Sequence, residues 1–143
     1  MKKALFIVGP TAVGKTKLAV EVSQKIPSVL ISADSIQVYR GANIISGKDH
    51  PKDTKIELID VIPPTESFSV RDFVHRVKAI VEPLEQQILP VIVGGTGLYV
   101  NSLFSKIDTV NIPQNESLRE ELSQLDTEAL QEKLKEVDSE NLS

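Results

Sequence analysis

Residues 9–16 constrain this chain more than any other feature. They follow the pattern Gly-x-x-x-x-Gly-Lys-Thr, between a short apolar run at residues 4–8 and a segment whose apolar residues recur every four positions. A glycine-rich turn between a buried strand and a helix points consecutive backbone amides at an anion. The pattern predicts a phosphate-binding loop of the P-loop NTPase kind, for a di- or triphosphate such as that of ATP. The alternative is a glycine-rich turn with an incidental lysine.

The whole loop is a candidate phosphate site, and two of its side chains carry further chemistry. Lys15 can reach the outer phosphate, and we expect it to be catalytic. The Thr16 hydroxyl can bind a magnesium ion, so Mg²⁺ is the expected cofactor and Thr16 its protein ligand. The candidate phosphate-binding residues are Gly9, Pro10, Thr11, Ala12, Val13, Gly14, Lys15 and Thr16.

Strand-like and helix-like segments alternate along the first 106 residues. This order predicts an α/β fold, with a P-loop NTPase-like parallel sheet flanked by helices and joined by right-handed crossovers. We expect residues 41–57 to form a surface loop, residues 58–62 to be a brief apolar run, and Pro83 to interrupt or end one helix. The expected strands cover residues 4–8, 29–32 and 90–93, and the expected helices cover residues 16–26, 69–87 and 98–104.

A second cluster of polar residues follows the strand expected at residues 29–32. Ligands of open α/β sheets bind at the carboxyl ends of the strands, where Asp34 would lie close to the phosphate loop. Asp34 can act as a general base or a magnesium partner, or can cap a turn. Arg40 alone would be read as a surface residue. The grouping favours a substrate-facing loop that contains Asp34, Ser35, Ile36, Gln37 and Arg40.

A third candidate site, residues 94–97, follows the strand expected at residues 90–93. Its sequence is Gly-Gly-Thr-Gly, in which glycines let a ligand approach the backbone and Thr96 supplies a side-chain hydroxyl. A helix-capping role for Thr96 is the alternative. Because all three sites lie at the same predicted edge of the sheet, we expect them to form one cleft.

Composition limits the chemistry available to the chain and indicates its cellular compartment. It contains no cysteine, which excludes disulfides, thiolate metal sites and cysteine nucleophiles. The apolar run at residues 4–8 is too short for a signal peptide, and no stretch is long enough to span a membrane. We therefore expect a cytoplasmic protein without a membrane partner. Nothing in the sequence indicates an oligomer, so a monomer is favoured.

Charge is distributed unevenly along the chain. The net charge is −4, yet residues 1–106 hold 13 Lys or Arg against 10 Asp or Glu, whereas residues 107–143 hold 3 against 10. The first segment can therefore meet a polyanion such as RNA. The acidic segment has two leucine stripes, which predict two short amphipathic helices that pack against an apolar surface. We divide the chain into an α/β core at residues 1–110 and an acidic helical segment at residues 111–143, and we expect both to belong to something longer.

Four segments together resemble the tRNA dimethylallyltransferase family, also called tRNA isopentenyltransferase. The resemblance extends from about residue 5 to about residue 106, and residues 111–134 resemble the start of that family's helical insertion. The segments occur in the family's order and at similar spacing. They are GPTAVGKT, ISADSIQVYRG, LIDVIPPTESFSVRDF and PVIVGGTGLYV.

The resemblance implies transfer of a dimethylallyl group from dimethylallyl diphosphate to the exocyclic amine of an adenine beside a tRNA anticodon. The phosphate loop would hold the diphosphate leaving group. By the same resemblance, Asp34 is the general base, and Thr96 lies near the scissile oxygen. Residues 35–37 contact the target adenine, which must leave its stack to enter the cleft.

The sequence departs from the family at two short places and in length. Ile56-Glu57 replaces two histidines found in many members, and residues 45–48 read Ile-Ser-Gly-Lys where members have Gly-Thr-Ala-Lys. Family members are roughly twice as long. Three alternatives therefore stay open: an adenylate isopentenyltransferase acting on a free nucleotide, a P-loop kinase of small molecules, and an inactive phosphate-binding fragment.

Overall fold

The computed structural model describes residues 3–41, 54–104, 112–113 and 115–138. The chain divides into two compact units, residues 1–110 and residues 111–143. None of the helices in the described part combines the length and the apolar composition that a membrane span requires. The departure noted at residues 45–48 lies outside the described residues.

The first unit is built on a four-stranded sheet whose strands are all parallel. The strand order is β1-β4-β2-β3, so the last strand in the sequence lies between the first two. This arrangement confirms the predicted parallel sheet, and it brings the carboxyl ends of β1, β4 and β2 together at one edge. The strands are β1 (Leu5–Val8), β2 (Ser28–Ser32), β3 (Ile56–Glu57) and β4 (Leu89–Gly94).

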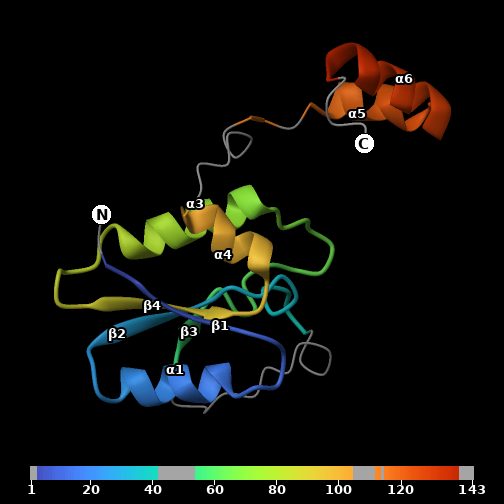
Figure 1. Cartoon of the computed structure of the whole chain (residues 1–143). Helices are drawn as coiled ribbons and strands as arrows, with labels where there is room; N and C mark the ends of the chain where they lie inside the picture. The colour runs from blue at the N-terminus through green and yellow to red at the C-terminus, as the bar shows by residue number, and fades with distance from the viewer. Residues whose placement is uncertain (1–2, 42–53, 105–111, 114, 139–143) are drawn as a thin grey trace. The chain divides into compact units, whose positions relative to one another are not determined.

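Helices cover both faces of this sheet (Figure 1). Helix α1 (Lys15–Ser23) lies on one face, and helices α3 (Val70–Val81) and α4 (Gly97–Phe104) lie on the other. Alternate residues of β2 and β4 point to opposite faces, which gives two separate cores. The core on the α1 side contains Ala19, Val20, Leu30, Ile56, Val91 and Val93. The core on the α3 side contains Ile31, Ala33, Leu58, Phe73, Val74, Val77, Ile92 and Tyr99.

Three elements differ from their predicted extents, each for a local reason. Helix α1 ends at Ser23, because Pro27 disfavours helical backbone in the residue before it and a turn occupies the intervening positions. Helix α3 ends at Val81, just before Pro83, which has no N–H to donate. The predicted surface loop at residues 41–57 was wrong at its end, since Ile56 is buried and pairs with Leu30 of β2.

Helix α3 begins with a capping box. The Ser69 hydroxyl accepts from the backbone N–H of Asp72, and the Asp72 carboxylate accepts from both the N–H and the hydroxyl of Ser69. These hydrogen bonds, led by the one from the hydroxyl, hold the pKa of Asp72 below its ordinary value despite some opposing desolvation. The box defines the start of the helix that covers one face of the sheet.

The second unit is a pair of short helices, α5 (Glu116–Ser123) and α6 (Thr127–Val137). Asn115 and Asp126 cap their N-termini, and a hydrogen bond from Lys133 lowers the pKa of the Glu121 carboxyl. This outcome matches the two predicted amphipathic helices. Their apolar stripes remain largely exposed at Leu118, Leu130, Leu134 and Val137. That residues 111–143 begin an insertion domain stays a prediction.

At Gly94 the end of β4 lies very close to the chain just beyond β2. A Cβ atom placed on Gly94 would lie 2.2 Å from the carbonyl oxygen of Ala33, which is far inside van der Waals contact. The Ala33 N–H donates to the Val93 carbonyl at 2.8 Å. The close approach is therefore part of the backbone hydrogen bonding that joins the two strands. Only glycine fits at position 94 without moving a backbone.

We expect Gly94→Ala to lower the free energy of unfolding by about 3 kcal/mol, the upper end for an inserted methyl group, because two backbones must separate. Gly97→Ala is the matched control. A Cβ atom there meets nothing within 4 Å, and alanine favours the helix, so stability should stay within about 1 kcal/mol. Urea denaturation of both variants tests this, and equal effects would contradict the assigned contact.

Candidate functional site: three loops at one edge of the sheet

The phosphate loop leaves the N-terminus of α1 open to a ligand. Gly14, the residue before the helix, has φ 88°, and Ala12 within the loop has φ 66°, so both adopt left-handed backbone. Among the described residues no side chain caps α1, and its first turn carries no acidic residue. The first backbone amides of a helix have no acceptor within the helix. The loop therefore presents unpaired donors and the positive end of a helix dipole.

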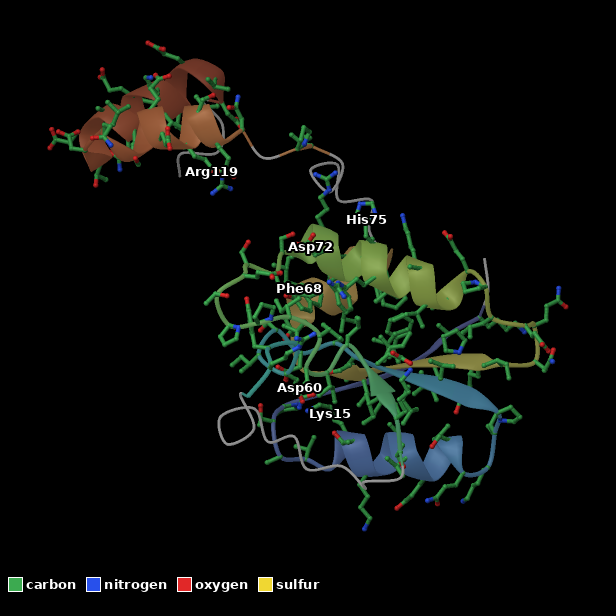
Figure 2. The ribbon with its side chains drawn as sticks, turned by 180° about the vertical axis from the view of Figure 1, so that it is seen from behind. Lys15, Asp60, Phe68, Asp72, His75 and Arg119 are labelled. Carbon is green, nitrogen blue, oxygen red and sulfur yellow. The ribbon has the colours of Figure 1, made fainter. Side chains whose placement is uncertain are left out.

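Lys15 lies at the same edge, above the start of α1 (Figure 2). Its Nζ atom donates to the Pro10 carbonyl at 2.5 Å, which folds the side chain back over the loop. A Cβ atom on Gly95 would lie 3.9 Å from this Nζ and 3.2 Å from the Gly9 carbonyl oxygen. The third predicted site therefore lies directly beside the first, at a position where glycine keeps the approach to the ammonium group clear.

The second site is residues 34–40, which we call the acceptor loop. Its first residue, Asp34, stabilises the backbone of this loop through its carboxylate. The Oδ1 atom of Asp34 accepts from the N–H groups of Ile36 at 2.8 Å and Gln37 at 3.2 Å. Aspartate commonly stabilises turns in this way. None of the described residues donates a hydrogen bond to Oδ2. Asp34 therefore caps a turn through one oxygen, as one of the alternatives expected from the sequence, while a role of the second oxygen as a base or magnesium partner stays a prediction.

Thr96 connects the second site to the third. Its hydroxyl oxygen accepts from the Ser35 N–H at 3.1 Å, and its own N–H donates to the Ala33 carbonyl at 3.3 Å. The two bonds join the end of β4 to the chain just beyond β2. The three predicted sites thus lie together, through direct contact between Thr96 and the acceptor loop and through the position of Gly95 beside Lys15, while the single cleft stays a prediction.

The remaining residues of the acceptor loop have distinct surroundings. Ser32 donates through its hydroxyl to the Gln37 carboxamide oxygen at 2.9 Å, which orients that side chain. Ile36 is 45% exposed. The Arg40 guanidinium donates to the carbonyl oxygens of Asp60 at 3.1 Å and Val61 at 3.5 Å. Arg40 therefore binds neighbouring backbone with part of its donor set.

An aromatic group lies beside the acceptor loop. The Tyr99 ring stacks on Phe73 with centroids 4.5 Å apart, and its hydroxyl donates to the Phe68 carbonyl at 3.4 Å. Burial raises the pKa of the Tyr99 hydroxyl above its ordinary value, and three nearby acidic groups raise it further: Tyr39, Asp72 and Asp34. Tyr99 is therefore a neutral phenol within electrostatic range of Asp34.

The expected magnesium ion fits these residues only in part. Thr16 is half-buried at the start of α1, where a hydroxyl can bind Mg²⁺. The described part of the chain holds no group of three His, Cys, Asp or Glu side chains that could hold a metal ion. Magnesium in such loops is bound by one or two protein oxygens together with substrate phosphates and water. Thr16 would therefore hold the ion together with a bound diphosphate.

Comparison with known proteins settles the family. The model of the IPP transferase family matches residues 37–143, and a model described as isopentenyl transferase matches residues 2–61. The chain belongs to the IPP transferase family. The resemblance stated from four sequence segments is thereby confirmed.

Curated relatives of this IPP transferase family member are named tRNA dimethylallyltransferase. The protein from Finegoldia magna is 40% identical over 128 residues, which cover 87% of this chain and 41% of the relative. One from Geotalea uraniireducens is 42% identical over 127 residues, with 87% and 42% covered. The chain thus spans about two-fifths of the length of these relatives.

Solved structures agree on the fold of this IPP transferase family member. A tRNA isopentenylpyrophosphate transferase from Bacillus halodurans superposes with a TM-score of 0.71 at 37% identity, over 98% of this chain and 49% of the other. A eukaryotic dimethylallyltransferase acting on tRNA gives 0.80 at 26% identity, over 97% and 36%. The predicted P-loop NTPase-like fold is confirmed.

Sequence reasoning missed the part that residues 58–62 play in this site. The sequence predicts a brief apolar run here, which also begins one of the four family segments, but it does not predict that the carbonyls of Asp60 and Val61 accept from the Arg40 side chain. Asp60, which has φ 55°, offered a weak signal, since aspartate tolerates left-handed backbone more readily than most residues. Leu58, with φ 64°, offered none, because leucine rarely adopts this conformation.

We expect Thr96→Val to weaken the acceptor loop without unfolding the sheet. Valine has nearly the same shape but cannot accept from the Ser35 N–H, so the free energy of unfolding should fall by about 1–2 kcal/mol. Thr65→Val, at an exposed turn, is the matched control and should have almost no effect. Chemical denaturation measures both, and amide exchange at Ser35 should accelerate only in Thr96→Val. An unchanged Ser35 amide would contradict the bond.

Proposed function

We propose that this chain provides the diphosphate site and the general base of a tRNA dimethylallyltransferase. The donor would be dimethylallyl diphosphate, and the acceptor the exocyclic amine of an adenine beside a tRNA anticodon. Membership of the IPP transferase family supports this proposal, as do the names of the curated relatives. The chain covers only about two-fifths of those relatives, so the reaction is tested both on the chain alone and on a longer chimera.

The observation that carries the proposal is the meeting of the three loops. Gly95 lies against Lys15 and the Gly9 carbonyl, while Thr96, the next residue, accepts from Ser35 beside Asp34. An anion held by Lys15 and the α1 amides would therefore sit next to the Thr96 hydroxyl and near a carboxylate oxygen. Transfer of an allyl group needs an anion-binding site close to a base, as in this arrangement.

The proposed step breaks the bond between carbon 1 of the dimethylallyl group and its diphosphate oxygen, and forms a bond from that carbon to the adenine amine nitrogen. The electron pair of the broken bond leaves with the diphosphate. Lys15 and the α1 amides stabilise the charge that develops there. Asp34 takes the proton that the amine loses, through its Oδ2 atom, while Oδ1 remains bound to the Ile36 and Gln37 amides.

Thr96 and Thr16 have supporting roles in this proposal. The Thr96 hydroxyl already accepts from Ser35, and its proton is available for the oxygen that leaves the carbon. When bound, Mg²⁺ neutralises charge on the diphosphate, and Thr16 would hold it there. Residues 35–37 would face the adenine, with the exposed Ile36 side chain as an apolar contact.

The test measures transfer of labelled dimethylallyl groups, with magnesium, to unmodified tRNA or to AMP. Two proteins are compared: the 143-residue chain, and a chimera that joins this chain to the part of the Finegoldia magna relative beyond the matched residues. Label in tRNA from either protein supports the proposal. Label in AMP alone would move the acceptor to a free nucleotide. Phosphate transfer from labelled ATP without isoprenoid would indicate a kinase, and no transfer from a folded chimera would refute the proposed function.

Two variants should separate binding from turnover in these proteins. Lys15→Ala should weaken diphosphate binding about tenfold to 100-fold, because it removes a charge-assisted hydrogen bond. Asp34→Asn should leave binding nearly unchanged, since the asparagine oxygen can still accept from the Ile36 and Gln37 amides, but should lower kcat about 100-fold to 10,000-fold. Calorimetric titration and single-turnover kinetics measure the two effects. Loss of diphosphate binding in Asp34→Asn would reject the general-base role.

A further inference from the structure

Residues 58–62, the support turn, adopt a backbone that their sequence does not favour. Leu58 and Asp60 have φ angles of 64° and 55°, in the left-handed region. Such a conformation is strained for a residue other than glycine. Outliers of this kind persist where the surrounding structure holds them, and they gather at ligand-binding sites. The support turn is therefore held in place by its contacts.

Backbone hydrogen bonds join the support turn to the acceptor loop. The Asp60 N–H donates to the Gln37 carbonyl at 3.0 Å, and the Val61 N–H donates to the Val38 carbonyl at 2.9 Å. The Arg40 N–H donates in return to the Ile62 carbonyl at 2.8 Å. The side chains of Val38, Leu58 and Ile62 are buried beneath this ladder, with at most 4% of their surfaces exposed.

The Arg40 side chain adds two hydrogen bonds between the acceptor loop and the support turn. Its Nε and Nη2 atoms donate to the successive carbonyls of Asp60 and Val61. A planar guanidinium can present two donors in one fixed orientation, whereas a lysine ammonium is a compact point charge that cannot reproduce this fork. A short series of hydrogen bonds connects Arg40 to Asp34. The Asp60 N–H donates to the Gln37 carbonyl, and the Gln37 N–H donates to the Asp34 carboxylate.

We propose that Arg40 is a positioning residue, which holds the acceptor loop in its bonded form through the support turn and does not act by binding tRNA. The role assigned to Asp34 rests on the function proposed above, but the positioning does not. Arg40 keeps the Asp60 and Val61 carbonyls in place, and these residues keep the Gln37–Val38 backbone in place. The turn at residues 34–37 then holds the Asp34 carboxylate at a constant orientation.

The first experiment measures amide hydrogen exchange by NMR in the 143-residue chain. Arg40→Ala and Arg40→Lys should both accelerate exchange at Ile36 and Gln37 about fivefold to tenfold, as expected for losing one hydrogen bond. The amides of β4 should be unchanged. Arg71→Ala, which removes an exposed arginine from α3, is the matched control and should accelerate neither set. Unchanged exchange at Ile36 and Gln37 in both Arg40 variants would overturn the proposal.

The second experiment separates positioning from a charge contact with tRNA, using the chimera. If Arg40 positions the loop, Arg40→Lys should lower kcat about as much as Arg40→Ala does, with the KM for tRNA nearly unchanged. If Arg40 instead contacts a phosphate, Arg40→Lys should retain activity and Arg40→Ala should raise the KM, which would overturn the proposal. Absence of transfer in the parent chimera would refute the proposed function alone, because the exchange experiment still decides on the positioning role.

Discussion

The contact between Gly94 and the Ala33 carbonyl is the constraint on which the site depends. It brings the carboxyl ends of β2 and β4 closer than any side chain would allow. Two residues beyond Gly94, Thr96 bonds the chain on both sides of Asp34, through the Ala33 carbonyl and the Ser35 amide. In the other direction β4 pairs with β1, which places Gly95 beside the phosphate loop. One tight strand pair thus sets the distance between the phosphate loop and the Asp34 carboxylate.

An anion bound at the phosphate loop and the Asp34 carboxylate at the same sheet edge would repel each other. In the structure, each of the two negative groups has its own set of hydrogen-bond donors, which reduces this repulsion. The phosphate loop presents Lys15 and the free amides of α1, which attract negative charge. Asp34 directs one oxygen to the amides of Ile36 and Gln37, so part of its charge is already compensated. The two groups can therefore remain near each other, each with its own set of backbone donors.

Much of this arrangement could be predicted from sequence, since its signals are local. The glycine-rich motif, the buried strands and the clusters after them predicted the parallel sheet and the shared edge, and the resemblance predicted the family; the fold and the family are confirmed. The roles of Lys15, Asp34 and Thr96 stay predictions. Long-range pairings left no local pattern: Ile56 forms a strand because β2 offers a free edge, and Arg40 finds its acceptors about twenty residues away.

The support turn shows why left-handed backbone at a leucine is not predicted from the sequence. A leucine with left-handed backbone costs about 1–2 kcal/mol, which local propensity would count against it. Fully burying a leucine side chain contributes about 1.5–3 kcal/mol, and Leu58 is 96% buried within the core that contains Phe73 and Tyr99. The gain from burial is therefore similar in size to the strain, and at its upper end exceeds it. A glycine would remove the strain but also the buried side chain, so at this position packing, and not backbone freedom, determines the residue that holds the acceptor loop.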